Sequence, residues 1–124
     1  MKYFLSIGSN INATKNIEFA IKELSLILSN INKSSTYQTK AVGFEGDDFL
    51  NLVVSGESSF NFDELNLKLK KIEDLSGRNR NAPKFSARTL DIDIVLQVDV
   101  DEIIFESDEI EKYDFVSEPL KELF

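Results

Sequence analysis

The clearest pattern in the chain is GRNRNAPKFSARTLDIDIVLQV, residues Gly77 to Val98, where a basic loop leads into a strand with two aspartates. Successive side chains of a strand point to opposite faces. Asp91 and Asp93 are therefore predicted on one face, and the other face carries the apolar set Leu90, Ile92, Ile94 and Leu96. Two neighbouring carboxylates repel each other, and a shared proton or bound cations relieve that repulsion. The pattern predicts a core strand with a cation site on its second face, and a solvated strand face is the alternative.

The loop before this strand is rich in positive charge. Its basic side chains are Arg78, Arg80, Lys84 and Arg88. A polyphosphate needs both divalent metal and fixed positive charge, because metal ions neutralise bridging oxygens while guanidinium groups bind terminal ones. Residues 70–88 hold six basic and two acidic side chains, whereas residues 91–124 hold two basic and twelve acidic ones. A basic island in an acidic protein favours one small anion over a polymer.

Composition excludes several kinds of chemistry. The 124 residues suffice for one domain, residues 1–124, with a real core, and 42% of them are hydrophobic. The chain has no cysteine and no histidine, so thiol nucleophiles, disulfides and imidazole bases are excluded. Catalysis would have to rely on carboxylates, metal and positioning. The net charge of −8 argues against a nucleic-acid partner.

The sequence also predicts where the protein works. No apolar run approaches the roughly 20 residues that a membrane-spanning helix needs, so no membrane partner is expected. The first residues, MKYFLSIG, are too quickly broken to form a secretion signal. We therefore expect a cytoplasmic protein, acting as a monomer on small molecules.

Upstream of the basic loop, the pattern predicts a helix between Asn61 and Gly77. Asn61 and Glu64 have the spacing of a capping box, and Phe60 and Leu65 that of a hydrophobic staple. Gly77 is a typical helix stop. Before this helix, residues 49–56 read as a central strand in which Asn51 is unusual, because a buried amide needs a partner. Asn51 is expected either to hydrogen-bond to a neighbouring loop or to hydrogen-bond to a ligand.

The remaining elements are predicted from hydrophobic spacing. Alternation in residues 2–7 indicates a strand, and spacing of three and four in residues 14–31 indicates a helix. Residues 33–39 are predicted as a strand, residues 40–48 as a loop, and residues 102–105 as a hairpin strand. An acidic tail follows, in which residues 115–120 have an anchoring apolar cluster.

The predicted order is β-α-β-β-α-β with an extra C-terminal hairpin strand. This order is typical of an α+β, ferredoxin-like sandwich, with two helices on one face of an antiparallel sheet. The other face is then expected to be free for a site that contains Asp91, Asp93 and Asn51.

Three stretches carry a resemblance to a known family. They are Gly8-Ser9-Asn10, the run from Val42 through Asn51, and above all Gly77-Arg78 with Arg88-Thr89-Leu90-Asp91-Ile92-Asp93. In this order they resemble the 6-hydroxymethyl-7,8-dihydropterin pyrophosphokinases of folate biosynthesis. The resemblance implies transfer of pyrophosphate from ATP to the hydroxymethyl group of the pterin, with release of AMP and with two Mg²⁺ ions.

The resemblance also implies residue roles. Asp91 and Asp93 would bind both metal ions, and the catalytic set would be Arg78, Arg88, Asp91 and Asp93. The pterin would be bound by Thr39, Val42, Phe49, Asn51 and Phe115, with the two phenylalanines on either side of its ring. The nucleotide would be bound by Glu73, Arg80, Lys84, Phe85, Arg88 and Ile94.

The chain departs from the family's usual pattern in two places. Relatives usually carry a histidine and an arginine after the hairpin, whereas residues 106–113 are acidic here, with Lys112 as their cation. In the basic loop, a usual tryptophan is Phe85 and a usual arginine is Lys84, which keeps the charge but loses the bidentate fork. Besides an active enzyme, two interpretations stay open: a binding protein for nucleotide, pterin or a partner on the same scaffold, and a small regulatory domain.

Overall fold

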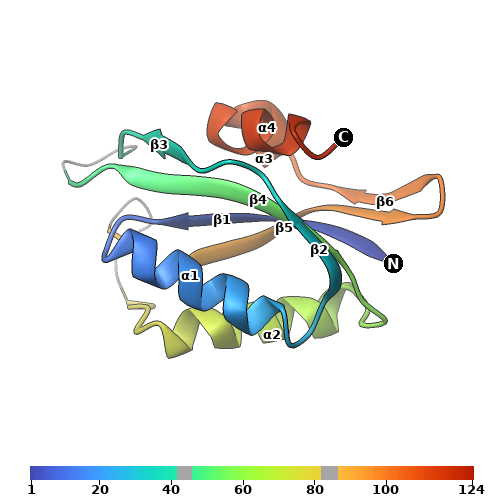
Figure 1. Ribbon diagram of the computed structural model, residues 1–124, viewed down its shortest axis with the longest axis horizontal. Helices are drawn as coiled ribbons and strands as arrows, with labels where there is room; N and C mark the ends of the chain where they lie inside the picture. The colour runs from blue at the N-terminus through green and yellow to red at the C-terminus, as the bar shows by residue number, and fades with distance from the viewer. Residues whose placement is uncertain (42–45, 82–86) are drawn as a thin grey trace.

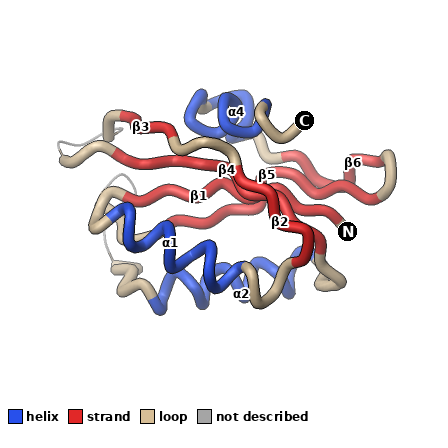
Figure 2. The backbone as a smooth tube through the Cα atoms, viewed as in Figure 1, coloured by secondary structure: helices blue, strands red, loops and turns tan. Residues whose placement is uncertain are grey.

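The computed structural model describes residues 1–41, 46–81 and 87–124. It is an α+β fold in which one sheet lies between two helical layers (Figures 1 and 2). The strands are β1 (Lys2–Ser9), β2 (Ser29–Lys33), β3 (Tyr37–Thr39), β4 (Phe49–Glu57), β5 (Asp91–Asp99) and β6 (Glu102–Glu106). The helices are α1 (Ala13–Leu24), α2 (Phe62–Leu75), α3 (Glu109–Lys112) and α4 (Asp114–Lys121).

The sheet has six strands in the order β2-β4-β1-β5-β6, and β3 pairs with β4 beyond the end of β2. All neighbours are antiparallel. Because β2 and β3 line the same edge of β4, they together take the place of the single strand predicted for residues 33–39. The arrangement is the split β-α-β of a ferredoxin-like fold, and the predicted extra hairpin strand is β6. The predicted fold class is confirmed.

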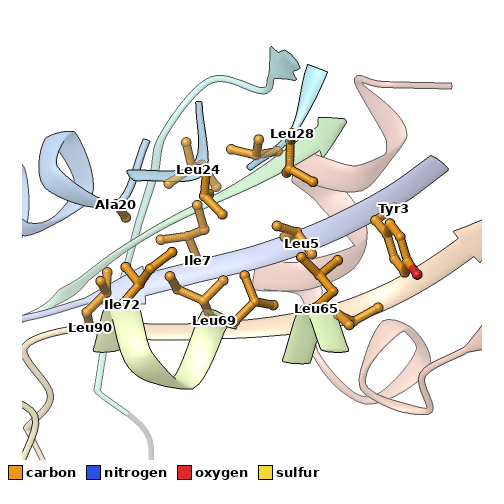
Figure 3. Packing of buried hydrophobic residues seen from close by; sticks show 14 of the residues in the cluster. Tyr3, Leu5, Ile7, Ala20, Leu24, Leu28, Leu65, Leu69, Ile72 and Leu90 are labelled. Carbon is orange, nitrogen blue, oxygen red and sulfur yellow. The ribbon is translucent and has the colours of Figure 1, made fainter. Parts of the chain in front are cut away.

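The main core lies between the sheet and helices α1 and α2. Tyr3, Leu5 and Ile7 project from β1 into this layer, and Figure 3 shows them among leucines of both helices. Burying large apolar side chains is the dominant favourable term in folding, at about 1.5–3 kcal/mol for each. The predicted alternation in β1 is confirmed, and Leu52 and Val54 of β4 face the same layer.

The opposite face of the sheet is covered in part, and the prediction of a fully open second face is wrong. Helix α4 lies across it (Figure 1), and Val116 and Leu120 pack on Phe4, Val53 and the end of β5. These residues form a second, smaller core. The predicted anchoring of residues 115–120 is confirmed by this packing. The site is therefore confined to the part of this face that α4 leaves uncovered.

Helix α1 is shorter than predicted. It ends at Leu24 rather than Ile31, and the chain then makes a turn with hydrogen bonds from the N–H groups of Ile27 and Leu28 to Leu24 O, both near 3.0 Å. Leu28 packs against Gly56, where an added Cβ would meet it at 3.0 Å. Apolar spacing continues past the helix because Ile27 and Leu28 of the turn pack on the same core as the helix. Ile31 belongs to β2.

A bulge interrupts the predicted alternation of β5. Leu5 is paired with Ile94 while its neighbour Phe4 is paired with Leu96, so Val95 is an extra residue in β5. An extra residue exchanges the two faces of the strand beyond it. Leu96 therefore lies in the second core and not with Ile92, contrary to the prediction. Asp91 and Asp93 precede the bulge, and their predicted face is unaffected.

Helix α2 begins and ends as its sequence indicates. Asn61 Oδ1 accepts from the Glu64 N–H at 2.9 Å and Glu64 Oε1 accepts from the Asn61 N–H at 3.0 Å, which is a complete capping box. At the other end Gly77 has φ +89°. The Arg78 N–H donates to Glu73 O at 3.4 Å, which turns the loop back against the helix. This turn brings Arg78 to the last turn of α2 and to the start of β5.

Candidate active site

Three central strands align the predicted site residues in rows. Gly8 of β1 is paired with Asn51 of β4 on one side and with Asp91 of β5 on the other. Paired residues share a face of the sheet, and neighbouring strands are about 4.8 Å apart. Asn51 and Asp91 therefore face the same side, about 10 Å apart. In the next row Ser6 lies between Val53 and Asp93.

One edge of β5 is bonded to side chains of α2 instead of to a strand. Among the described residues, β6 pairs with β5 only from Leu96 onward, and no strand pairs with this edge between Asp91 and Ile94. The Ile92 N–H donates to Glu73 Oε2 at 2.7 Å, and Lys70 Nζ donates to Ile92 O at 3.3 Å. These two side chains are hydrogen-bond partners for backbone groups of Ile92 that a neighbouring strand would otherwise have to bond.

Glu73 is the buried centre of this cluster. Its side chain is 0% exposed. Its two oxygens accept from four donors: Lys70 Nζ at 3.2 Å, Arg78 Nη1 at 3.2 Å, Arg80 Nη1 at 2.7 Å and the Ile92 N–H at 2.7 Å. A carboxylate has about four acceptor positions. The four acceptor positions of Glu73 are thus all occupied by groups of the protein, and Glu73 fixes the positions of Lys70, Arg78 and Arg80.

The two aspartates are each paired with cations. Asp91 accepts from Arg78 Nη1 at 3.3 Å on one oxygen, and its other oxygen lies 3.5 Å from Arg88 Nη1. Asp93 Oδ1 lies 3.2 Å from Lys70 Nζ. Their side chains are 32% and 37% exposed, so both remain within reach of solvent and ligand. The prediction that Asp91 and Asp93 leave the core face is confirmed.

Repulsion within the cluster shows in its pKa values. Burial and the neighbouring Asp91 raise the pKa of Asp93, although Lys70 acts in the opposite direction. Burial lowers the pKa of Lys70, but attraction to Asp93 and Glu73 outweighs it, so the net shift is upward. Burial and then Asp93 and Asp91 raise the pKa of Glu109, which begins α3. Such clustered carboxylates favour a bound cation.

These carboxylates form a group with the geometry of a metal site. Glu73, Asp91 and Asp93 each offer an oxygen, and the three oxygens lie within 4.8 Å of one another. Oxygen ligands of this kind suit Mg²⁺. Because Glu73 is already saturated by four donors, Asp91 and Asp93 are the members available to an incoming ion.

Sequence reasoning missed Asn10, which joins the two loops beside the site. Its side-chain amide donates to Asp47 O at 3.1 Å, and its oxygen accepts from the Arg88 N–H at 2.8 Å. The Asn10 N–H also donates to Arg88 O at 3.1 Å. Asn10 thereby fixes the backbone that carries Arg88. The only sequence signal was its place in the Gly-Ser-Asn motif.

Three of the predicted pterin residues, Thr39, Phe49 and Asn51, lie near the face that carries Asp91. The Asn51 amide donates to Thr39 Oγ1 at 2.6 Å, so Asn51 ties β4 to β3. An added Cβ on Gly8 would lie 2.9 Å from Asn51 Oδ1 and 3.8 Å from the Phe49 ring, which places both side chains over Gly8. Phe115 stacks on Tyr113, with ring centroids 4.7 Å apart, beside the second core. Thr39, Phe49 and Asn51 are brought together.

The other predicted residues fall into three groups. Val42, Lys84 and Phe85 lie outside the described residues. Ile94 is 5% exposed and packs in the main core, so its side chain does not face the acidic cluster. Arg80 is 41% exposed and also pairs with Asp74 at 2.9 Å. Lys70, which sequence reasoning assigned no role, could have been found from its spacing of three residues before Glu73.

Fold and site together define a ferredoxin-like α+β protein whose sheet carries paired aspartates ringed by arginine and lysine. The model of the 7,8-dihydro-6-hydroxymethylpterin-pyrophosphokinase family matches residues 4–124. The chain belongs to this family. It is 39% identical over 98 residues to a 2-amino-4-hydroxy-6-hydroxymethyldihydropteridine pyrophosphokinase of Aquifex aeolicus, a match that covers 77% of this chain.

The same match spans 61% of the length of the Aquifex protein. Among residues 1–41, 46–81 and 87–124, no helix is long and apolar enough to cross a membrane.

Proposed function

We propose that the protein transfers pyrophosphate from ATP to the hydroxymethyl group of 6-hydroxymethyl-7,8-dihydropterin, in folate biosynthesis. The products would be AMP and the pterin diphosphate. The observation that carries the proposal is the placement of Asp91 and Asp93 on one face, with Arg78 and Arg88 on Asp91. Family membership supports the same reaction.

The residues present fit the metal that such a reaction needs. Asp91 and Asp93 would hold two Mg²⁺ ions, since both side chains are about one-third exposed and offer hard oxygen ligands. Bound there, Mg²⁺ would neutralise the polyphosphate and lower the pKa of the attacking hydroxyl group. Glu73 would keep the surrounding cations in place without itself being a ligand.

The protein's own contribution would be alignment and charge. The hydroxymethyl group would release its proton to solvent as its oxygen forms a bond to the β-phosphorus of ATP. The bond from that phosphorus to the α,β-bridging oxygen would break, and AMP would leave. Arg88 lies 3.5 Å from Asp91 Oδ2 and would contact the transferring group, and Arg78 holds Asp91 Oδ1 at 3.3 Å. Such transfers need little covalent help from a protein, which suits a chain without histidine or cysteine.

The pterin would lie along the row that begins at Asn51. The Asn51 amide and Thr39 would meet its polar edge, and Phe49 and Phe115 would flank its ring, at a distance of about two strands from Asp91. Arg80, Lys84 and Phe85 would bind the nucleotide, and Val42 would line the pterin pocket with Thr39. The setting we propose is a cytoplasmic monomer that acts on these small molecules.

A turnover assay tests the proposal directly. Protein, ATP, Mg²⁺ and 6-hydroxymethyl-7,8-dihydropterin are incubated, and AMP and the pterin diphosphate are followed by chromatography with mass detection. We expect both products in equal amounts. If neither forms while ATP with Mg²⁺ still binds, the chain is a binding protein on the family's scaffold and the proposed transfer is wrong.

Asp93→Ala is the matched inactive variant. It should abolish product formation while leaving the unfolding midpoint in urea unchanged or raised, because burial and Asp91 already disfavour the charged Asp93. Circular dichroism checks the fold. Full activity in this variant would exclude Asp93 as a metal ligand, and loss of cooperative unfolding would mean that its main role is structural.

A further inference from the structure

The proposed reaction gives no role to Lys70, although three acceptors surround its ammonium group. Its ammonium group lies 3.2 Å from Glu73 Oε2, 3.2 Å from Asp93 Oδ1 and 3.3 Å from Ile92 O. An ammonium group has three donors, and three acceptors surround it here. The side chain is 35% exposed, so it lies at the rim of the cluster and remains open to a ligand.

The three partners of Lys70 are not equivalent. Glu73 is fully buried and holds three further donors, and Ile92 O belongs to the strand backbone, so both are fixed. Asp93 is the partner that can change, because its side chain is 37% exposed and can be reached by an incoming ion. Within the described residues, Lys70 is also the cation that the structure pairs with Asp93.

A positive charge at this point has two opposite effects on ligands. It repels a divalent ion that approaches Asp93, and it attracts the phosphate oxygens of a nucleotide. In this structure Glu73 and Ile92 O hold the ammonium group beside Asp93.

We propose that Lys70 is a displaceable internal cation: it neutralises Asp93 in the ligand-free protein, gives way when a divalent ion binds there, and then contacts the polyphosphate. Lys70 thus couples the two ligands, because the ion binds more favourably when a polyphosphate is present to receive the ammonium group. The metal-loaded form of the proposed pyrophosphokinase would be reached mainly with nucleotide present. This inference rests on the proposed function for the identity of the nucleotide, and on the contacts of Lys70 for the rest.

The test uses Lys70→Gln and measures two affinities by calorimetry. The first is that of Mg²⁺ for the nucleotide-free protein, and the second is that of ATP in EDTA. Removing one positive charge a few ångströms from the ion should strengthen Mg²⁺ binding by about tenfold in a largely solvated site. The same change should weaken ATP binding by about tenfold, because one phosphate contact is lost.

Two further variants make the result specific. Lys71→Gln removes the same charge from the neighbouring, exposed position of α2 and should leave both affinities within about twofold of the wild type, because exposed charges are screened by solvent. Lys70→Arg keeps the charge and should keep weak Mg²⁺ binding even if Lys70→Gln proves poorly folded. Circular dichroism establishes the fold of each variant.

Unchanged or weaker Mg²⁺ binding in folded Lys70→Gln would overturn the inference, as would equal effects of Lys70→Gln and Lys71→Gln. Tighter Mg²⁺ binding in Lys70→Arg would overturn it too. The outcomes are separate from those of the turnover assay. An inactive wild type would refute the proposed transfer and leave the metal comparison valid, whereas an active wild type with no effect of Lys70 would refute only the internal cation.

Discussion

Gly8 is small because the side chains of Asn51 and Phe49 lie above it. An added Cβ would lie 2.9 Å from Asn51 Oδ1, which is closer than unbonded atoms of this kind approach. Gly8 also separates Asn51 from Asp91 in the same row of the sheet. At this residue the glycine is required by contact, since its φ is not positive.

Gly8→Ala should therefore lower the free energy of unfolding by about 1–3 kcal/mol, the usual cost of overpacking. It should also weaken binding of 6-hydroxymethyl-7,8-dihydropterin, because Asn51 is displaced from Thr39. Urea unfolding and calorimetry measure the two effects.

A double-mutant cycle separates this clash from a general strand effect. In an Asn51→Ala background the side chain that Gly8→Ala strikes is absent, so the same substitution should cost much less stability. Equal costs in both backgrounds would show that Asn51 is not the reason for the glycine.

At the scale of elements, α4 is bonded to the β2–β3 edge through one residue. Glu122 follows α4 and accepts from the Ser35 N–H at 2.9 Å, from the Ser35 hydroxyl at 2.8 Å and from the Tyr37 hydroxyl. The hydrogen bonds from the Ser35 N–H and from both hydroxyls lower the pKa of Glu122. This contact holds the C-terminal end of α4 against the edge formed by β2 and β3.

The contact should depend on pH in a defined direction. The pKa of Glu122 is lower in the folded state than in the unfolded one, so its contribution to stability is present above the unfolded pKa. It is lost as the pH falls through the folded pKa. We expect Glu122→Gln to unfold at lower urea than the wild type at pH 7, and the difference to shrink below about pH 4.

Glu118→Gln is the control for this comparison. Glu118 is exposed on α4 and pairs only loosely with Lys121, at 3.5 Å. Its removal should leave the midpoint nearly unchanged at both pH values. If the two variants behave alike, net charge explains the effect and the specific contact does not.

At the scale of the whole molecule, one sheet serves two cores. Leu69 is 0% exposed in the core under α1 and α2, and Leu120 is 4% exposed in the core under α4. Residues of β1, β4 and β5 alternate between the two, so neither core can be lost without exposing strands of the other. A single cooperative domain over residues 1–124 is the prediction that follows.

Unfolding should accordingly occur in one transition. Far-ultraviolet circular dichroism and the near-ultraviolet signal of tyrosine should give the same midpoint, since Tyr3 reports on one core and Tyr113 on the other. Leu69→Ala and Leu120→Ala should each cost about 2–5 kcal/mol and keep the transition single. A first transition in Leu120→Ala that leaves the other core intact would contradict a single domain.

Much of the fold follows from local sequence. The spacing around Asn61 and Glu64 determined the start of α2, because a capping box uses only neighbouring residues, and Gly77 determined its end. Alternation before the bulge determined that Asp91 and Asp93 leave the core. The ferredoxin-like order followed from the sequence of elements, and the basic loop beside paired aspartates indicated an anion site with metal.

Tertiary structure decided the rest, because it depends on contacts distant in the sequence. Leu28 continues the apolar spacing of α1, but it lies in a turn after the helix, where it packs against Gly56 of β4. The bulge at Val95 appears only when β5 pairs with β1, and it moved Leu96 to the other core. Glu73 and Lys70 gained their roles only when α2 reached the free edge of β5. The spacing of residues within α2 does not indicate that the backbone N–H and C=O of Ile92, 19 residues after Glu73, need an acceptor and a donor.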